Sequence, residues 1–109
     1  MNRHLYGDRL QVTDEQIAEF CQRWQIDELA VFGSVLREDF GQDSDVDMLV
    51  TFAPSSDWSL LDHVQMKQEL TSLLGRDVDL VSRRAIDRSE NWIRRKEIQR
   101  TAQVVYASR

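Results

Sequence analysis

The chain has 109 residues, the size of one compact domain and too few for two independent hydrophobic cores. Its composition, 41% hydrophobic and 30% charged, is typical of a soluble globular protein, and no apolar stretch is long enough to cross a bilayer. The single cysteine, Cys21, excludes an intramolecular disulfide, and its helical spacing favours core packing over a reactive thiol. Residues 1–10 lack the apolar core of a signal peptide, so we expect a cytoplasmic protein without membrane contact.

The net charge of −5 is unevenly divided along the chain. Residues 1–82 carry 6 Lys and Arg against 16 Asp and Glu, whereas residues 83–109 carry 8 against 3. Taken alone, such a basic segment suits nucleic acid, an anionic ligand or an acidic partner surface, and equally well a solvated helix face.

A helix and a strand are predicted in the first third of the chain. The capping box of Thr13 and Gln16, followed by apolar residues at i, i+3, i+4 and i+7, predicts a helix over about 14–24. Residues 29–32 form a short apolar run that stops at Gly33, which is typical of a buried strand leading into a tight turn.

Two strands and a helix follow. Alternating residues predict a strand over 45–52, which stops before Pro54. Ser59 is the expected cap of a helix that ends at Gly75, and a third strand is predicted over 77–81. The helix is expected to turn its leucines and valine inward, namely Leu60, Leu61, Val64, Leu70, Leu73 and Leu74.

The C-terminal segment completes the predicted fold. A basic helix is expected over about 91–100, and residues 104–106 are either a short strand or the last turn of that helix. The element order predicts an α/β (α+β) fold, a small mixed sheet flanked by helices, in a single domain spanning residues 1–109.

Two aspartates interrupt the second predicted strand. Asp45 and Asp47 are two residues apart and therefore point to the same side, where Asp79 joins them if the third strand is a neighbour. Clustered carboxylates repel one another unless a cation neutralises them, and an all-oxygen ligand set favours Mg²⁺ or Mn²⁺ over Zn²⁺. The alternative makes Asp45 a turn residue and Asp47 an edge-strand charge that discourages aggregation.

The turn after the first predicted strand supplies groups that bind anions. Gly33 and Ser34 offer backbone N–H groups and a hydroxyl to a phosphate. Arg37 lies one turn further on, where it either reaches a phosphate oxygen or pairs with Glu38 or Asp39 on the surface.

Together these residues form the pattern G-S-x10-D-x-D with a later strand-borne Asp79, and over residues 28–106 they resemble the DNA polymerase beta nucleotidyltransferase superfamily. The segments FGSVLREDFGQDSDVDMLV and GRDVDLV are similar to its minimal nucleotidyltransferase branch. The resemblance implies a polymerase-beta-like fold in which Asp45 and Asp47 bind two Mg²⁺ ions. It also implies that Asp79 acts at the metal that activates the attacking hydroxyl, with Asp77 as the alternative third acid, and that the Gly-Ser turn holds a triphosphate.

The branch also implies a biological role. Minimal nucleotidyltransferases resemble the antitoxins of HEPN/MNT toxin-antitoxin systems, which transfer AMP from ATP to a tyrosine of a cognate HEPN ribonuclease toxin. A non-catalytic antitoxin that only binds its toxin, and a transferase acting on RNA or a small molecule, are the alternatives. Direct nucleic-acid binding is not expected.

The basic C-terminal segment is compatible with such a partner. The basic residues Arg94, Arg95 and Arg100 would face an acidic toxin surface or the ATP phosphates. Trp58 and Trp92 are either partner contacts or core residues.

Overall fold

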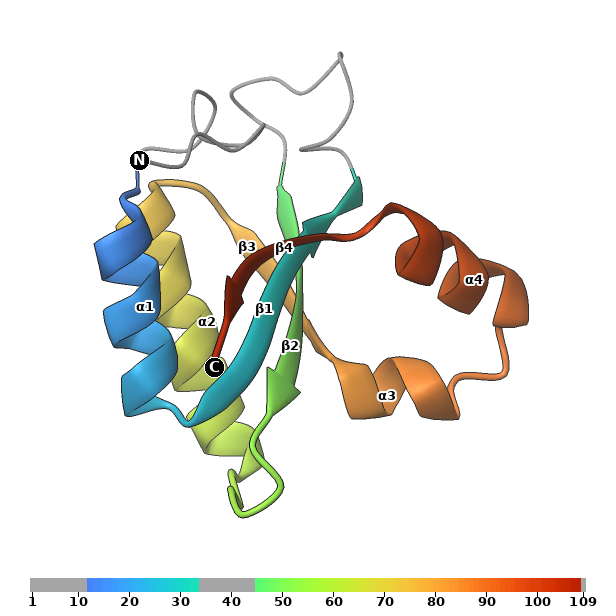
Figure 1. The fold of residues 1–109 in the computed structure, drawn as a ribbon, viewed down its shortest axis with the longest axis horizontal. Coiled ribbons are helices and arrows are strands. Elements are labelled where there is room, and N and C mark those ends of the chain that lie inside the picture. The colour runs from blue at the N-terminus through green and yellow to red at the C-terminus, as the bar shows by residue number, and fades with distance from the viewer. Residues whose placement is uncertain (1–11, 34–44, 109) are drawn as a thin grey trace.

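The computed structural model describes residues 12–33 and 45–108, which form a four-stranded sheet with helices on both faces (Figure 1). The elements are α1 Asp14–Arg23, β1 Ile26–Phe32, β2 Val46–Phe52, α2 Leu60–Leu74, β3 Val78–Ser82, α3 Arg83–Arg88, α4 Trp92–Thr101 and β4 Gln103–Ala107. The strand order is β3-β2-β1-β4, with β2 and β3 parallel and the other two pairs antiparallel. The predicted small mixed sheet flanked by helices is therefore confirmed.

Each face of the sheet buries its own apolar cluster. The larger cluster joins α1 and α2 to one face, and its fully buried members include Phe20, Leu29, Met48 and Leu70. The smaller cluster lies on the other face, where α3 and α4 each contribute one buried isoleucine, and consists of Ala30, Phe32, Leu49, Ile86 and Ile98. Helices α3 and α4 therefore cover only part of their face.

The C-terminal part of the chain contains a helix that was not predicted and a strand that had been one of two predicted alternatives. Helix α3 was not predicted, because its six residues contain a single buried apolar residue, Ile86, which is too few to show a helical period. Ser82 caps this helix by accepting a hydrogen bond from the Ala85 backbone N–H at 3.1 Å. The residues after α4 form a strand, β4, which pairs with β1, so the strand alternative is the correct one.

The predicted inner face of α2 was wrong in its first two turns. Leu60, Leu61 and Val64 are 81%, 77% and 43% exposed, whereas the buried residues are Met66, Leu70 and Leu74. Leu61 and Val64 are displaced from this i, i+4, i+8 stripe by more than a quarter turn, because each residue advances about 100° around the helix. Sequence spacing therefore identified the leucines but not the side of the helix that packs.

Two single-residue predictions can be compared with the packing. Cys21 is fully buried, and burial raises the pKa of its thiol to about 12, so the prediction of an inert core cysteine is confirmed. Trp58 packs edge-on against Trp24 with ring centroids 5.1 Å apart and donates its Nε1–H to the Trp24 carbonyl at 2.8 Å. Trp92 is 58% exposed and is therefore available to a partner.

Helices α1 and α2 are joined by the carboxylate of Glu69, which gives a testable pH dependence. It accepts hydrogen bonds from the Arg23 guanidinium and from Trp24 Nε1 at 2.8 Å, and the Arg23 bond lowers the pKa of Glu69. A lowered pKa contributes stability above the unfolded-state pKa, and this stability is lost as the pH falls through the folded-state pKa. Glu69→Gln should therefore reduce the free energy of unfolding modestly at pH 7 and less at pH 3, measured by urea denaturation. A difference that grows toward low pH would contradict this assignment.

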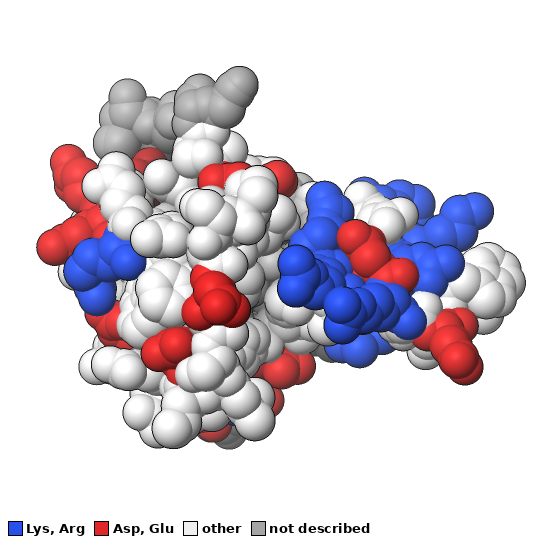
Figure 2. All heavy atoms as spheres, turned by 90° about the horizontal axis from the view of Figure 1, so that it is seen from below, with Lys and Arg blue, Asp and Glu red and all other residues white. Residues whose placement is uncertain are grey.

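Lysine and arginine side chains gather on α3 and α4 (Figure 2), which we call the basic lobe, residues 83–101. Its cations are Arg83, Arg84, Arg88, Arg94, Arg95, Lys96 and Arg100, and its acids are Asp87, Glu90 and Glu97.

The helices of the described part of the chain all fall short of the length and hydrophobicity of a membrane span.

Candidate functional site

The register of the sheet places the predicted acids in one row. Across β1, β2 and β3, Phe32 is the partner of Asp47, and Asp47 is the partner of Asp79. The next row on the same face, two residues away along each strand, is Ala30, Leu49 and Val81. That second row belongs to the apolar cluster under Ile86 and Ile98. The row with the two acids therefore lies next to a buried apolar row on the same face of the sheet. Asp47 is half-buried and Asp79 is exposed.

Adjacent parallel strands lie about 4.8 Å apart, so carboxylates on directly paired residues repel each other. The predicted acid cluster requires β3 to be a neighbour of β2, and the parallel pairing meets this condition. Asp45 precedes β2 and is exposed, with the alternation of the strand placing it on the same side as Asp47.

Gly33 closes this end of the sheet by approaching Asp47. Its φ is +79°, in the left-handed region that favours glycine, and a Cβ added here would lie 2.2 Å from Oδ2 of Asp47. A side chain at this position would therefore occupy the space that the Asp47 carboxylate fills. Backbone and carboxylate meet at the point where the sequence predicts the phosphate-binding turn to adjoin the metal site.

Asp77 lies outside this row. It precedes β3, is exposed, and its backbone carbonyl accepts a hydrogen bond from the Val46 N–H at 2.9 Å. Only Asp79 is paired in register with Asp47. This favours Asp79 over Asp77 as the third acid.

The predicted metal ligands have the chemistry that a divalent cation requires. Asp45, Asp47 and Asp79 offer only oxygen ligands, which Mg²⁺ prefers. In residues 12–33 and 45–108, no three His, Cys, Asp or Glu side chains are grouped closely enough to hold a metal ion. The oxygen chemistry of the three acids suits a hard cation, whereas their described side chains do not converge on a single point.

Four further residues were predicted to bind phosphate or the partner. Ser34 and Arg37 fall outside the described residues. Arg95 donates from Nη1 to the Ser89 carbonyl at 2.6 Å, and Arg100 pairs with Glu97 at 2.8 Å.

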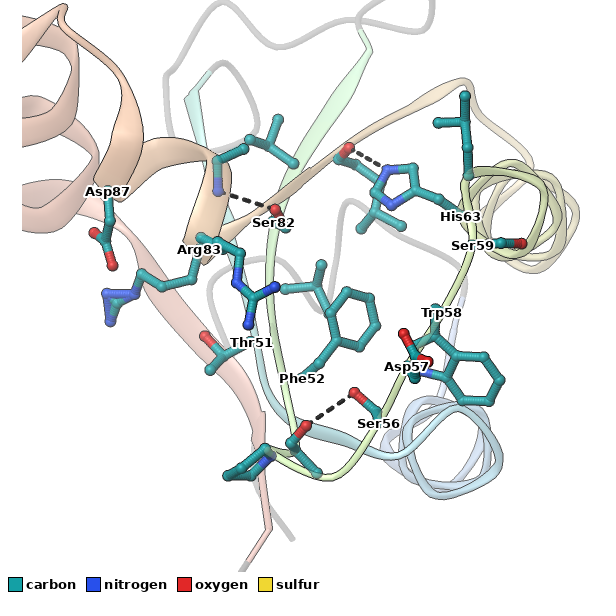
Figure 3. Close-up of a pocket in the computed structure, with 18 of the residues that line it drawn as sticks. Thr51, Phe52, Ser56, Asp57, Trp58, Ser59, His63, Ser82, Arg83 and Asp87 are labelled. Carbon is teal, nitrogen blue, oxygen red and sulfur yellow. Dashed lines mark hydrogen bonds between the residues drawn. The ribbon is translucent and has the colours of Figure 1, made fainter.

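The sequence analysis assigned no role to a group of residues at the opposite end of β2 and β3. Here His63 on α2 and Arg83 on α3 line a pocket of about 800 Å³ together with Thr51, Phe52 and Ser56 (Figure 3). No sequence signal marks it, because its walls come together only through the adjacency of β2 and β3.

Comparisons with known proteins show similarity to nucleotidyltransferases in sequence and in fold. The sequence profile of a family described as the nucleotidyltransferase domain matches residues 14–105. Protein adenylyltransferase MntA of Thermococcus cleftensis is 40% identical over 68 residues, which are 62% of this chain and 67% of that protein. Relatives from Methanocaldococcus jannaschii are matched over 59–64% of their length, which is less than two thirds.

Two solved structures share the fold. One, provisionally named a minimal nucleotidyltransferase, is 36% identical with a TM-score of 0.63, covering 83% of this chain and 86% of that chain. The other is a complex of a tri-AMPylated HEPN toxin of Shewanella oneidensis with an MNT antitoxin. It contains a chain with 18% identity and a TM-score of 0.60, over 87% of this chain and 70% of that chain, so this likeness concerns the fold alone.

Proposed function

Because this chain belongs to the nucleotidyltransferase domain family, we propose that it transfers AMP from ATP to a tyrosine hydroxyl of a HEPN-type ribonuclease toxin in the cytoplasm and so neutralises it. The similarity to a protein adenylyltransferase supports the type of reaction and a protein as the acceptor. The complex of an AMPylated HEPN toxin with an antitoxin contains a chain of the same fold as this protein. Its toxin supports the proposal that the acceptor is a protein of the HEPN type.

One observation carries the proposal: the strand register pairs Asp47 with Asp79 beside Gly33. Two carboxylates on paired residues repel each other, and a divalent cation bound between them relieves this repulsion. Gly33 lets the turn approach this row, because the Asp47 carboxylate occupies the place that a side chain at this position would take.

Each acid receives a role. We assign Asp45 and Asp47 to the binding of Mg²⁺, with two ions expected, and Asp79 to the ion nearer the attacking hydroxyl. Bound Mg²⁺ supplies the positive charge that neutralises these carboxylates and stabilises the oxygens that attack and leave.

The phosphate groups of ATP are assigned to the turn after β1. The backbone of Gly33 and the predicted contributions of Ser34 and Arg37 would hold the triphosphate, with donors directed at its oxygens. This fixes the α-phosphorus next to the carboxylate row, so the chain contributes mainly by positioning the two reactants.

The transfer forms one bond and breaks one. The tyrosine oxygen attacks the α-phosphorus in line, and the bond from this phosphorus to the oxygen bridging to the β-phosphorus breaks. Pyrophosphate leaves with the electron pair, and the phenolic proton passes to solvent by way of the Asp79 carboxylate.

The basic lobe offers a surface suited to binding the toxin that this reaction requires. Arg94 and Lys96 are exposed, and Trp92 and Ile93 beside them are 58% and 64% exposed. Tryptophan and arginine are the residues most enriched at the energetic centres of protein interfaces. We assign this surface to an acidic region of the toxin.

The function is tested by incubating the protein with Mg²⁺, ATP labelled at the α-phosphate, and the product of the neighbouring gene. Label should appear on a tyrosine of that partner, identified by mass spectrometry, and its ribonuclease activity should fall in parallel. Inhibition without label would indicate an antitoxin that acts by binding, and label in bulk RNA would indicate a transferase of a different class. ATP labelled at the γ-phosphate serves as the control and should leave the partner unlabelled.

A further inference from the structure

A pocket separate from the carboxylate row lies beyond the C-terminal ends of β2 and β3. Its volume is about 800 Å³, within the range of roughly 300–1,000 Å³ that is usual for small-molecule sites. β2 contributes Val50, Thr51 and Phe52 to it, whereas Asp47 stands near the other end of the same strand. In open α/β sheets, ligands bind preferentially beyond the carboxyl ends of parallel strands, and β2 and β3 are the parallel pair of this sheet.

The walls of the pocket come from opposite sides. Figure 3 shows Ser59 and His63 on the side of α2, Arg83 on the side of α3, and Phe52 between them. Val50, Phe52 and Leu80 are apolar members of the lining. The pocket thus combines apolar and polar side chains.

Several polar groups of the pocket are held in place by bonds to the protein. Nε2 of His63 lies 2.9 Å from the Leu80 carbonyl, so in the neutral ring it carries the proton and leaves Nδ1 as an acceptor. Ser56 Oγ donates to the Ala53 carbonyl at 2.8 Å. These contacts fix the walls before any ligand binds, which reduces the entropy lost on binding.

Among the described residues, no ion pair neutralises the arginines of the pocket. Arg83, Arg84 and Arg88 all line it, and within the described ranges none of the three forms a side-chain hydrogen bond or an ion pair. Asp87 stands four residues after Arg83, yet no ion pair joins them there. Asp57 also lines the pocket, so the lining carries one net positive charge when His63 is neutral.

We propose that this pocket binds an organic phosphate, a phosphate ester carrying an aromatic or apolar body of about the size of a nucleoside. Arginine guanidinium groups form paired, charge-assisted hydrogen bonds with phosphate oxygens. The apolar lining then accepts the body of the ligand, and Nδ1 of His63 is suited to accept a hydrogen bond from one of its hydroxyl groups. The site is independent of the proposed transferase site, from which it is separated by the length of β2.

The proposal is tested by titrating AMP into the isotope-labelled protein without divalent metal and following the Trp58 indole and His63 ring resonances by NMR. Saturable shifts of both are expected. Arg83→Ala combined with Arg88→Ala should weaken binding by at least about tenfold, because charge-assisted hydrogen bonds are lost. Lys67→Ala, which removes an exposed cation of α2 outside the pocket, should leave the affinity unchanged.

Three results would overturn the proposal: no saturable shift, equal affinity in the double arginine variant, or equal affinity for inorganic phosphate, which has no apolar body. Asp47→Asn should bind AMP at this pocket as the unaltered protein does, which separates failure here from failure of the proposed transfer reaction. Circular dichroism of each variant checks that it is folded.

Discussion

Replacement of Asp47 by asparagine is expected to abolish AMP transfer while the protein remains folded. The change removes one negative charge from the row that pairs Asp47 with Asp79, without changing the size of the side chain. A metal ion contributes several kcal/mol of transition-state stabilisation, so we expect the rate to fall by at least about a thousandfold. The rate of label transfer from α-labelled ATP at saturating Mg²⁺ measures this directly.

Stability provides the second measurement on the same variant. The free energy of unfolding should stay within about 1 kcal/mol of the original value, because paired like charges in a sheet contribute a repulsion of that order. Loss of activity together with loss of the folded state would leave the metal assignment unsupported, and full activity of Asp47→Asn would refute it.

Asp77→Asn is the matched control, since it removes the same charge two residues from Asp79. We expect this variant to keep nearly all of its activity and Asp79→Asn to lose it, because only Asp79 is paired with Asp47. The reverse result would move the third acid to Asp77. Glu90→Gln, a distant exposed carboxylate of the basic lobe, should be neutral in both assays.

How far the sequence determines this site can be judged from particular residues. Alternation within β2 places Asp45 and Asp47 on one side, and this local rule holds in any fold that contains the strand. The partnership of Asp47 with Asp79 depends on strand order, which alternation does not determine. From the sequence, Asp79 was predicted to join Asp47 only if β3 is a neighbour of β2. The parallel pairing of these two strands meets that condition. The resemblance to nucleotidyltransferases supplied what local rules lacked, and the family match confirms it.

The errors have a related cause. Leu60, Leu61 and Val64 were expected inside because they are apolar, yet the packed side of α2 is decided by what lies opposite it. The stripe that packs includes His63, whose ring reaches a backbone carbonyl of β3. Helix α3 was missed because its one buried residue, Ile86, has no periodic companions. The pocket between α2 and α3 depends on both elements and was therefore invisible in the sequence.

Gly33→Ala should reduce both stability and transfer, and for separable reasons. An alanine at the observed φ of +79° costs about 1–2 kcal/mol in backbone energy. In addition its Cβ would lie 2.2 Å from Oδ2 of Asp47, so the carboxylate has to move. Since a displacement of about 1 Å in a catalytic group lowers rates by roughly a hundredfold, we expect a loss of at least that size in label transfer.

Gly75→Ala separates the two effects. Gly75 has nearly the same backbone conformation, with φ of +70°, but no atom lies within 4 Å of a Cβ added there. Thermal or urea unfolding should show a loss of about 1–2 kcal/mol for this variant, while its transfer rate stays unchanged. If Gly33→Ala lost stability to the same extent and kept its activity, the contact between Gly33 and Asp47 would have no part in catalysis. If it lost activity while Gly75→Ala did not, the space beside the carboxylate row, rather than the flexibility of glycine, is what the reaction requires.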